Sequence, residues 1–124
     1  MSLTVRDVVA MLERRYPPEL AADWDAVGLA VGDPDATVTR VLLAVDAVQA
    51  VIDEAIERQC ELVVTHHPLY LRGTHSVAAT SAKGRVVHDL IGHGIALLTA
   101  HTNADHARPG ASDALADALG VRDT

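Results

Sequence analysis

The stretch LVVTHHPLY, residues 62–70, decides the fold and raises the first question about function. Its first four residues are apolar or β-branched, which is typical of a buried strand. Two histidines follow, and Pro68 then prevents the strand from continuing, because proline has no backbone N–H to donate to a neighbouring strand. The sequence therefore predicts a strand at 62–65 with two imidazoles, His66 and His67, at its carboxyl end.

Similar apolar runs lie on either side of this stretch, RVLLAV at 40–45 and IALLTA at 95–100. Helical patterns follow the three runs, at about 47–59, at about 81–92, and in a last segment that Ser112 caps and Gly120 closes. Continuous apolar runs that alternate with helices are typical of parallel strands buried on both faces. Right-handed crossovers place the helices on those faces. We predict an α/β fold, three-layer α/β/α with a largely parallel or mixed sheet.

The N-terminal region adds one helix and one strand to this pattern. Thr4 followed by Asp7 is a capping-box start, and the apolar residues that follow recur at helical spacing until Pro17 and Pro18 end the helix. The segment VGLAVG, residues 27–32, is expected to be a short edge strand between glycines. We expect residues 1–124 to form a single α/β metal-binding domain.

Composition excludes several classes of protein. The chain of 124 residues has ten basic and seventeen acidic side chains and no Lys/Arg run, which argues against DNA or RNA as a partner. Its one cysteine, Cys60, permits no intrachain disulfide and is expected to be a small buried residue. No stretch approaches the roughly 18 apolar residues of a membrane helix, and no signal-peptide pattern is present. We expect a cytoplasmic protein without a membrane partner.

Polar side chains follow each of the three predicted strands. Asp46 comes directly after the first strand, His66 and His67 after the second, and His101 after the third, with Asp105 four residues further on. The carboxyl ends of parallel strands meet at one edge of the sheet, where ligands bind in this class of fold. Imidazole suits zinc, iron and other first-row metals, and a carboxylate can accompany it. The sequence therefore predicts a metal site at this edge.

Neighbouring histidines project in different directions along a strand, so His66 and His67 are better placed to bind one ion each of a close pair than to chelate a single ion. Such a pair clamps a water and makes it a nucleophile near neutral pH. The alternative is a solvated pair without a metal. For Asp46 the alternative is to cap the helix that follows, which Gln49 three residues later favours.

Simpler roles are expected for the other polar residues near these strand ends. His93 is expected to stabilise a helix end, and Asn103 to order the loop after the third strand through its amide. His88 is expected on a helix surface. His75 and His106 are expected in loops beside the site, where a histidine can also have a functional role. Lys83 and Arg85 are expected on the surface near a helix start, where a cation can also contact a phosphate.

Three segments resemble one known family: WDAVGLAVG (24–32), VTHHPLY (64–70) and AHTNAD (100–105). They resemble the NGG-interacting-factor-three-like family of dinuclear metal-centre proteins, also named GTP cyclohydrolase I type 2 homologues. The resemblance covers nearly the whole chain. It implies His66, His67 and Asp105 as metal ligands, with Asp105 as the bridge and His101 close by. It also implies a divalent metal ion (Zn, Fe, Mn or Co), up to two in the complete site, and toroidal hexamers.

The chain departs from that family in length. Family chains are longer, and their second half carries a His-x-x-x-Glu pair that completes the dinuclear site, whereas no His or Glu follows His106 here. The chain thus resembles the N-terminal half of the family fold. Ala26 and Ala104 stand where the family usually has Asn and a larger apolar residue. We expect one metal or none in this chain alone, and an uncovered apolar surface that drives homo-oligomer formation.

Together these features favour a metal-dependent, hydrolase-like protein that acts on a small-molecule substrate, a nucleotide or a small phosphate compound, as the GTP cyclohydrolase resemblance implies. His66, His67 and Asp105 would hold the metal, and His101 would act as the catalytic residue that orients water or substrate. The alternatives are a non-enzymatic metal-binding oligomeric module and an inactive fragment of a longer enzyme. Whether the chain is an enzyme stays open at this point.

Overall fold

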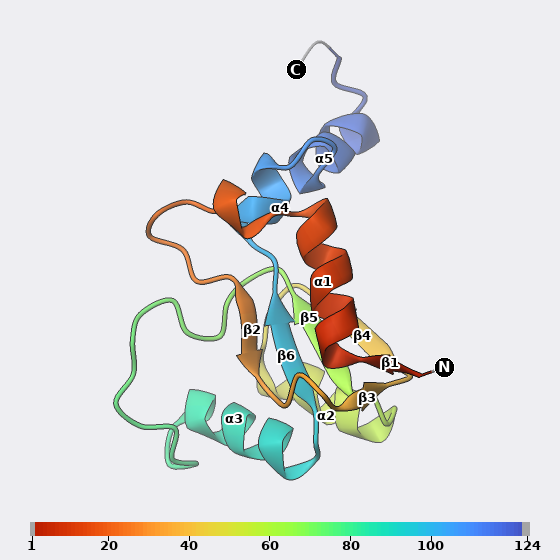
Figure 1. Cartoon of the computed structure of the whole chain (residues 1–124). Helices are drawn as coiled ribbons and strands as arrows, with labels where there is room; N and C mark the ends of the chain where they lie inside the picture. The colour runs from red at the N-terminus through yellow and green to blue at the C-terminus, as the bar shows by residue number, and fades with distance from the viewer. Residues whose placement is uncertain (1, 123–124) are drawn as a thin grey trace.

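The structure is a computed structural model that describes residues 2–122, so the two ends of the predicted domain lie outside the described residues. The elements alternate along the chain and are drawn in Figure 1. In chain order they are β1 (Leu3–Thr4), α1 (Val5–Arg15), the 3-10 turn η1 (Pro18–Leu20), β2 (Gly28–Val31), β3 (Thr37–Val38), β4 (Val41–Ala44), α2 (Gln49–Glu57), β5 (Leu62–Thr65), α3 (Ala82–Gly92), β6 (Ala96–Thr99), α4 (Thr102–His106) and α5 (Ala111–Leu119).

The main sheet has the strand order β2-β6-β5-β4. The three strands predicted from apolar runs are parallel, with Leu62 opposite both Val41 and Ala96. β2 is an edge strand, as predicted, and it runs antiparallel to β6. The sheet is therefore mixed, and the predicted strand, helix, strand pattern of its parallel part is confirmed. Outside it, β1 and β3 form a separate two-stranded antiparallel ladder that the sequence patterns did not predict.

Helices cover the sheet on both faces, which confirms the predicted three layers. Val63 and Leu97 point to the face packed by Ile52 of α2 and Leu90 of α3. Leu62 and Leu98 point to the opposite face, where Val5 of α1 packs. Successive strand residues thus alternate between two apolar layers. Figure 1 shows α1 lying across one face of the sheet, with α2 and α3 on the other side.

Two predicted helix starts are correct. Thr4 caps α1 by the predicted capping box, in which its hydroxyl accepts from the Asp7 amide and the Asp7 carboxylate accepts from the Thr4 amide. Ser81 caps α3 through its hydroxyl, which accepts from the Gly84 amide at 3.0 Å. The Thr4 prediction rested on a contact only three residues apart, which the local sequence determines, whereas for the helix near Ser81 only its approximate start was predicted.

Two predicted helix starts are wrong. Asp46 does not cap α2, whose N-cap is Val48 and has no side-chain cap; the Asp46 carboxylate instead contacts His67. Ser112 does not cap α5, which begins two residues earlier after Gly110, whose amide donates to Asp113 at 2.9 Å. A Cβ atom at position 110 would lie 2.3 Å from the Ala104 carbonyl oxygen, so close packing against α4 sets that helix start.

The predicted polar loop after the third strand contains a short helix, α4. The predicted end of the last helix is confirmed, because Gly120 closes α5 with φ of 72°. The one cysteine, Cys60, is buried as expected. Within residues 2–122 no helix has both the length and the apolar character needed to cross a bilayer.

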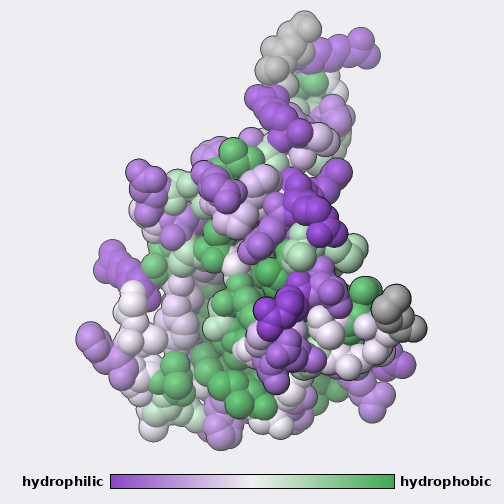
Figure 2. Space-filling model, viewed as in Figure 1, coloured by the Kyte–Doolittle hydropathy of each residue, from purple (hydrophilic) through white to green (hydrophobic). Residues whose placement is uncertain are grey.

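Apolar side chains remain exposed on the edge strand β4 and just beyond it. Leu43 is 75% exposed, and Val41 and Val45 are also exposed. Leu42 packs toward α2 and α3, so these alternating neighbours lie on the opposite face of the sheet, which α1 leaves uncovered at this edge. Figure 2 shows further hydrophobic surface in the middle of the face that carries α1. The expected uncovered apolar surface is present.

Candidate metal centre

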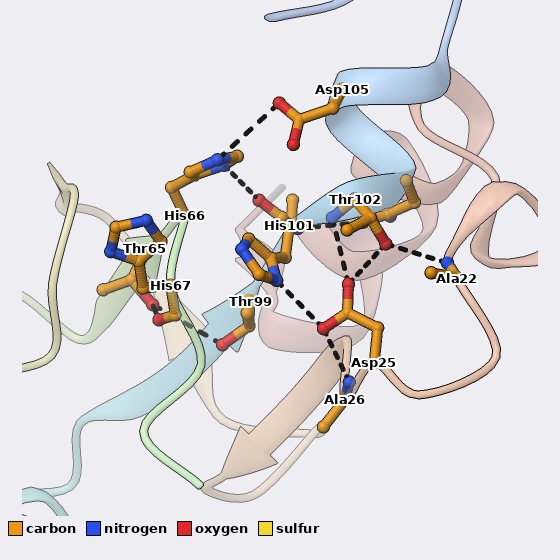
Figure 3. A network of polar contacts seen from close by, with 12 residues as sticks. Ala22, Asp25, Ala26, Thr65, His66, His67, Thr99, His101, Thr102 and Asp105 are labelled. Carbon is orange, nitrogen blue, oxygen red and sulfur yellow. Dashed lines mark hydrogen bonds and ion pairs between the residues drawn. The ribbon is translucent and has the colours of Figure 1, made fainter. Parts of the chain in front are cut away.

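Three histidines meet at the carboxyl ends of two neighbouring parallel strands. His66 and His67 follow β5, and His101 follows β6, while the last residues of these strands, Thr65 and Thr99, lie opposite each other. One ring nitrogen from each histidine lies within 4.8 Å of the other two. The ring centroids are separated by 5.0 to 5.5 Å. Figure 3 shows the three rings, with Asp25 beside His101 and Asp105 near His66.

The adjacent histidines can reach one centre because they lie beyond the strand. β5 ends at Thr65, and both histidines belong to the bend that follows. The His67 amide donates to the Val45 carbonyl at 2.9 Å, and the Thr65 hydroxyl donates to the His67 carbonyl at 3.0 Å. The expectation of one ion per histidine rested on the alternation of side chains along a strand. Because His66 and His67 lie in the bend after the strand, that alternation does not apply to them. The number of ions stays a prediction.

His101 is held by a carboxylate that sequence reasoning did not assign. Its Nδ1 lies 2.9 Å from Oδ1 of Asp25, whose side chain is fully buried. The same carboxylate accepts from the backbone amides of Ala26 at 2.8 Å and Thr102 at 3.0 Å, and from the Thr102 hydroxyl. In Figure 3 these donors converge on Asp25 from both sides. Asp25 therefore fixes both the orientation of the His101 ring and the start of α4.

The Asp25 carboxylate is ionised near neutral pH despite its burial. Burial raises the pKa of Asp25, but the hydrogen bonds from Thr102, His101 and Ala26 outweigh it and lower the pKa from 3.8 to about 2. Hydrogen bonds donated to a carboxylate favour its charged form, which is how a buried acid keeps its negative charge.

His67 is held by a second carboxylate in a very different environment. Its Nδ1 lies 2.6 Å from Oδ1 of Asp46, and the two side chains are 49% and 56% exposed. Asp46 thus takes part in the strand-end cluster that its position predicted, while its alternative role as a helix cap is not realised.

His66 is held by backbone rather than by a carboxylate. Its Nδ1 lies 3.0 Å from the Ala100 carbonyl oxygen, which only accepts hydrogen bonds. Nδ1 therefore carries the proton in the neutral ring, and Nε2 keeps its lone pair. That Nε2 lies 3.7 Å from Oδ1 of Asp105, too far for a hydrogen bond.

The three rings share one arrangement that suits a metal. Each Nδ1 faces an oxygen acceptor, from Ala100, Asp46 or Asp25. A histidine that donates from one nitrogen to a carbonyl or carboxylate presents the other as a metal ligand of fixed tautomer. Two ligands of one tetrahedral ion, each about 2.1 Å from it, lie about 3.4 Å apart, close to the separation of His66 from Asp105. The residues present fit a divalent ion.

The structure places the predicted site residues as follows. His66, His67 and His101 form the cluster, and Asp105 approaches only its His66 side. His93 bonds the Asp89 carbonyl at the end of α3, His106 bonds the Leu20 carbonyl, and His88 is exposed on α3, all outside the cluster. Asn103 orders the loop as expected, since its side-chain oxygen accepts from the His101 amide at 2.9 Å. Trp24, 61% exposed, lies edge-on to His101 with centroids 6.1 Å apart.

Comparison with known proteins identifies the family to which the chain belongs. Residues 3–124 match the family Duf34/NIF3 (NGG1p interacting factor 3). A protein of Streptomyces coelicolor named GTP cyclohydrolase 1 type 2 homolog is 60% identical over 113 residues, which cover 91% of this chain and 40% of that protein. A protein of the same name from Mycobacterium tuberculosis is 54% identical over 121 residues, 98% of this chain and 31% of that protein.

Solved structures resemble the fold closely. A Staphylococcus aureus hypothetical protein superimposes with a TM-score of 0.91 at 37% identity, over 97% of this chain and 40% of that chain. A Bacillus cereus protein related to NIF3 gives a TM-score of 0.92 at 34% identity, over 98% of this chain and 34% of that chain. The chain therefore spans less than half the length of the relatives that it matches.

Proposed function

The chain belongs to the Duf34/NIF3 family, and we propose that its strand-end histidines bind a divalent metal ion for the hydrolysis of a small phosphate compound or nucleotide. His66, His67 and His101 supply the imidazole nitrogens, and Asp105 supplies a carboxylate from the His66 side. The relatives are longer than this chain, which covers 40% and 31% of the two named above.

One observation carries the proposal: all three clustered rings have Nδ1 opposite an oxygen acceptor. His93 and His106 also face a carbonyl through Nδ1, but among residues 2–122 only the rings of His66, His67 and His101 bring three ring nitrogens within 4.8 Å of one another. Here the acceptors come from three separate segments, at Asp25, Asp46 and Ala100, and all of them leave Nε2 as the free nitrogen of the neutral ring. This common tautomer is the one that a metal needs, because only an unprotonated nitrogen is a ligand.

The residues of the chain have distinct roles in this proposal. Asp25 holds the His101 ring through Nδ1, so that Nε2 is the nitrogen left free for a ligand role. Asp46 does the same for His67 at the exposed side. Asp105, 3.7 Å from His66, would accept a proton or contact the ion beside that ring. When bound, a divalent ion supplies Lewis acidity, which makes a coordinated water a nucleophile near neutral pH.

The relatives' shared name gives the first substrate to test. Both are named GTP cyclohydrolase 1 type 2 homologs, so guanosine triphosphate and simpler phosphate esters are the compounds that we would assay. Among the metals, zinc, iron, manganese and cobalt all accept imidazole and carboxylate ligands.

A second function is favoured by a different observation. The exposed apolar residues of β4, with Leu43 at 75% exposure, support a metal-binding module whose role is assembly with further copies or another chain. Metal binding without hydrolysis of any phosphate compound, in an oligomer that Leu43→Glu dissociates, would favour this module over the hydrolase.

The first experiment is a titration of the metal-free protein with Co²⁺, followed by its visible spectrum. We expect His101→Ala to weaken Co²⁺ binding at least a hundredfold, since it removes a ligand nitrogen. The matched control is His93→Ala, because His93 also bonds a backbone carbonyl through Nδ1 but lies outside the cluster. Equal affinity of the two variants for Co²⁺ would contradict the proposed centre. Turnover that follows metal loading and is lost in Asp105→Ala would support the hydrolase.

A further inference from the structure

A cavity of about 360 Å³ lies beside the histidine cluster, between the start of α2 and the start of α3. Asp46, which holds His67, forms part of its rim. The cavity therefore lies next to the candidate metal centre, on its His67 side. Small-molecule sites have volumes of about 300–1,000 Å³ and lie in such hollows, next to the reactive groups.

The walls of this cavity are largely apolar. Ala47 and Leu69 are buried core residues, and Val86 of α3 is buried beside them. Pro68, which ends the histidine bend, adds a rigid apolar surface. Such walls contact a carbon ring rather than a hydrated ion, because burying an apolar surface against them is favourable.

One cation stands in the wall. Lys83 is the only lysine of the chain, and it lines both this cavity and a second hollow of about 350 Å³ that also includes Arg72. Its Nζ lies 5.4 Å from the centre of the Tyr70 ring, a cation–π contact that holds the ammonium in place. Among the ion pairs of residues 2–122, Lys83 has no acidic partner. Asp46 is the acidic group of the lining, and His67 engages it.

We propose that this cavity binds the organic part of the substrate, a small ring compound that carries a phosphate, and that Lys83 contacts the anionic group. The apolar walls would hold the ring, and the rim at Asp46 would direct the bound compound toward His67. The proposal extends the proposed function by naming a substrate pocket and a specificity residue, and its catalytic meaning rests on that function. The binding step does not, because it requires only the cavity and Lys83.

The test uses the complete metal-free chain and phenyl phosphate, which joins an apolar ring to a phosphate. Binding is followed by ¹⁵N-¹H NMR at constant ionic strength. We expect shifts of the Val48, Leu69 and Lys83 amides, and a Kd at least tenfold lower than that of inorganic phosphate. Lys83→Gln should weaken phenyl phosphate binding at least tenfold, because it removes the positive charge from the cavity wall.

Arg85→Gln is the matched control. Arg85 is exposed in the same first part of α3 and is not part of the cavity lining, so its loss should leave the Kd unchanged. Equal weakening by the two substitutions would overturn the proposal in favour of general surface charge. Equal Kd values for phenyl phosphate and inorganic phosphate would overturn the role of the apolar walls, and shifts confined to the His101 side would overturn the location. Phenyl phosphate binding that survives a failed Co²⁺ titration would separate the pocket from the metal centre.

Discussion

Two histidines of the cluster are each paired with an aspartate, but the two pairs differ in burial and in the number of hydrogen bonds at the carboxylate. In the pair of His101 and Asp25 the carboxylate is fully buried and accepts from four donors. In the pair of His67 and Asp46 both side chains are about half exposed, and among the side-chain hydrogen bonds of residues 2–122 the carboxylate contacts the His67 ring alone. The first pair is part of the folded core, whereas the second is attached to its surface.

This difference shows that a pairwise distance does not measure what a contact contributes. The exposed pair has the shorter separation, 2.6 Å against 2.9 Å, but water competes with it at both partners. Exposed ion pairs contribute about 0–1 kcal/mol. Breaking a buried charged network leaves donors without partners and costs about 3–5 kcal/mol. We therefore expect the buried pair to control stability and the exposed pair to affect only the site.

The largest expected effect comes from removing the buried charge. Asp25→Asn should lower the free energy of unfolding by about 3 kcal/mol, because Thr102 and His101 lose a charged acceptor in a buried position. Asp46→Asn should lower it by less than about 1 kcal/mol. Urea denaturation followed by far-UV circular dichroism measures both. Similar losses in the two variants would remove the distinction between the pairs.

A smaller effect is expected from acid. The pKa of Asp25 in the folded chain is about 2, below its ordinary value of 3.8, because the hydrogen bonds outweigh burial. A lowered folded-state pKa stabilises the fold above pH 4, and this contribution of about 2 kcal/mol is lost as the pH falls from about 4 to 2. Denaturation of metal-free protein at pH 6 and pH 2.5 should show that Asp25→Asn lacks this part of the acid destabilisation. An identical loss in wild type and variant would contradict it.

The smallest effect concerns the exposed pair. Asp46→Asn should weaken zinc binding about tenfold, because a carboxylate partner makes the imidazole a stronger ligand. Competition with a chromophoric chelator measures the affinity. Asp35→Asn is the control, since Asp35 is an exposed carboxylate paired with Arg6. Unchanged zinc affinity in Asp46→Asn would show that this pair is only a surface contact.

The sequence predicted the features that depend on neighbouring residues or on a simple topology. The three parallel strands, the Thr4 cap and the start of a helix near Ser81 follow from local patterns. The meeting of His66, His67 and His101 follows from the rule that parallel strands end at one edge.

Long-range contacts account for what the sequence did not predict. Asp25 lies in a segment of turns without periodicity, and its partner His101 is 76 residues away. Asp46 had a satisfactory local role three residues from Gln49, but His67, 21 residues away, takes its carboxylate instead. A tertiary contact that competes with a local one is not visible in either segment alone. The aspartate after Trp24 could have been suspected only because it belongs to a motif of the family resemblance.

Asn103 connects the histidine cluster to the end of helix α1. Its oxygen accepts from the His101 amide, and its nitrogen donates to the carbonyl of Tyr16, the residue that closes α1. One amide side chain thus joins the histidine centre to the end of a helix on the face of the molecule. A ligand that restricts the motion of His101 should therefore also slow the opening of the last turn of α1. Hydrogen exchange at that turn would then report occupancy of the centre without a probe placed in it, and fraying of the helix would in turn loosen the centre.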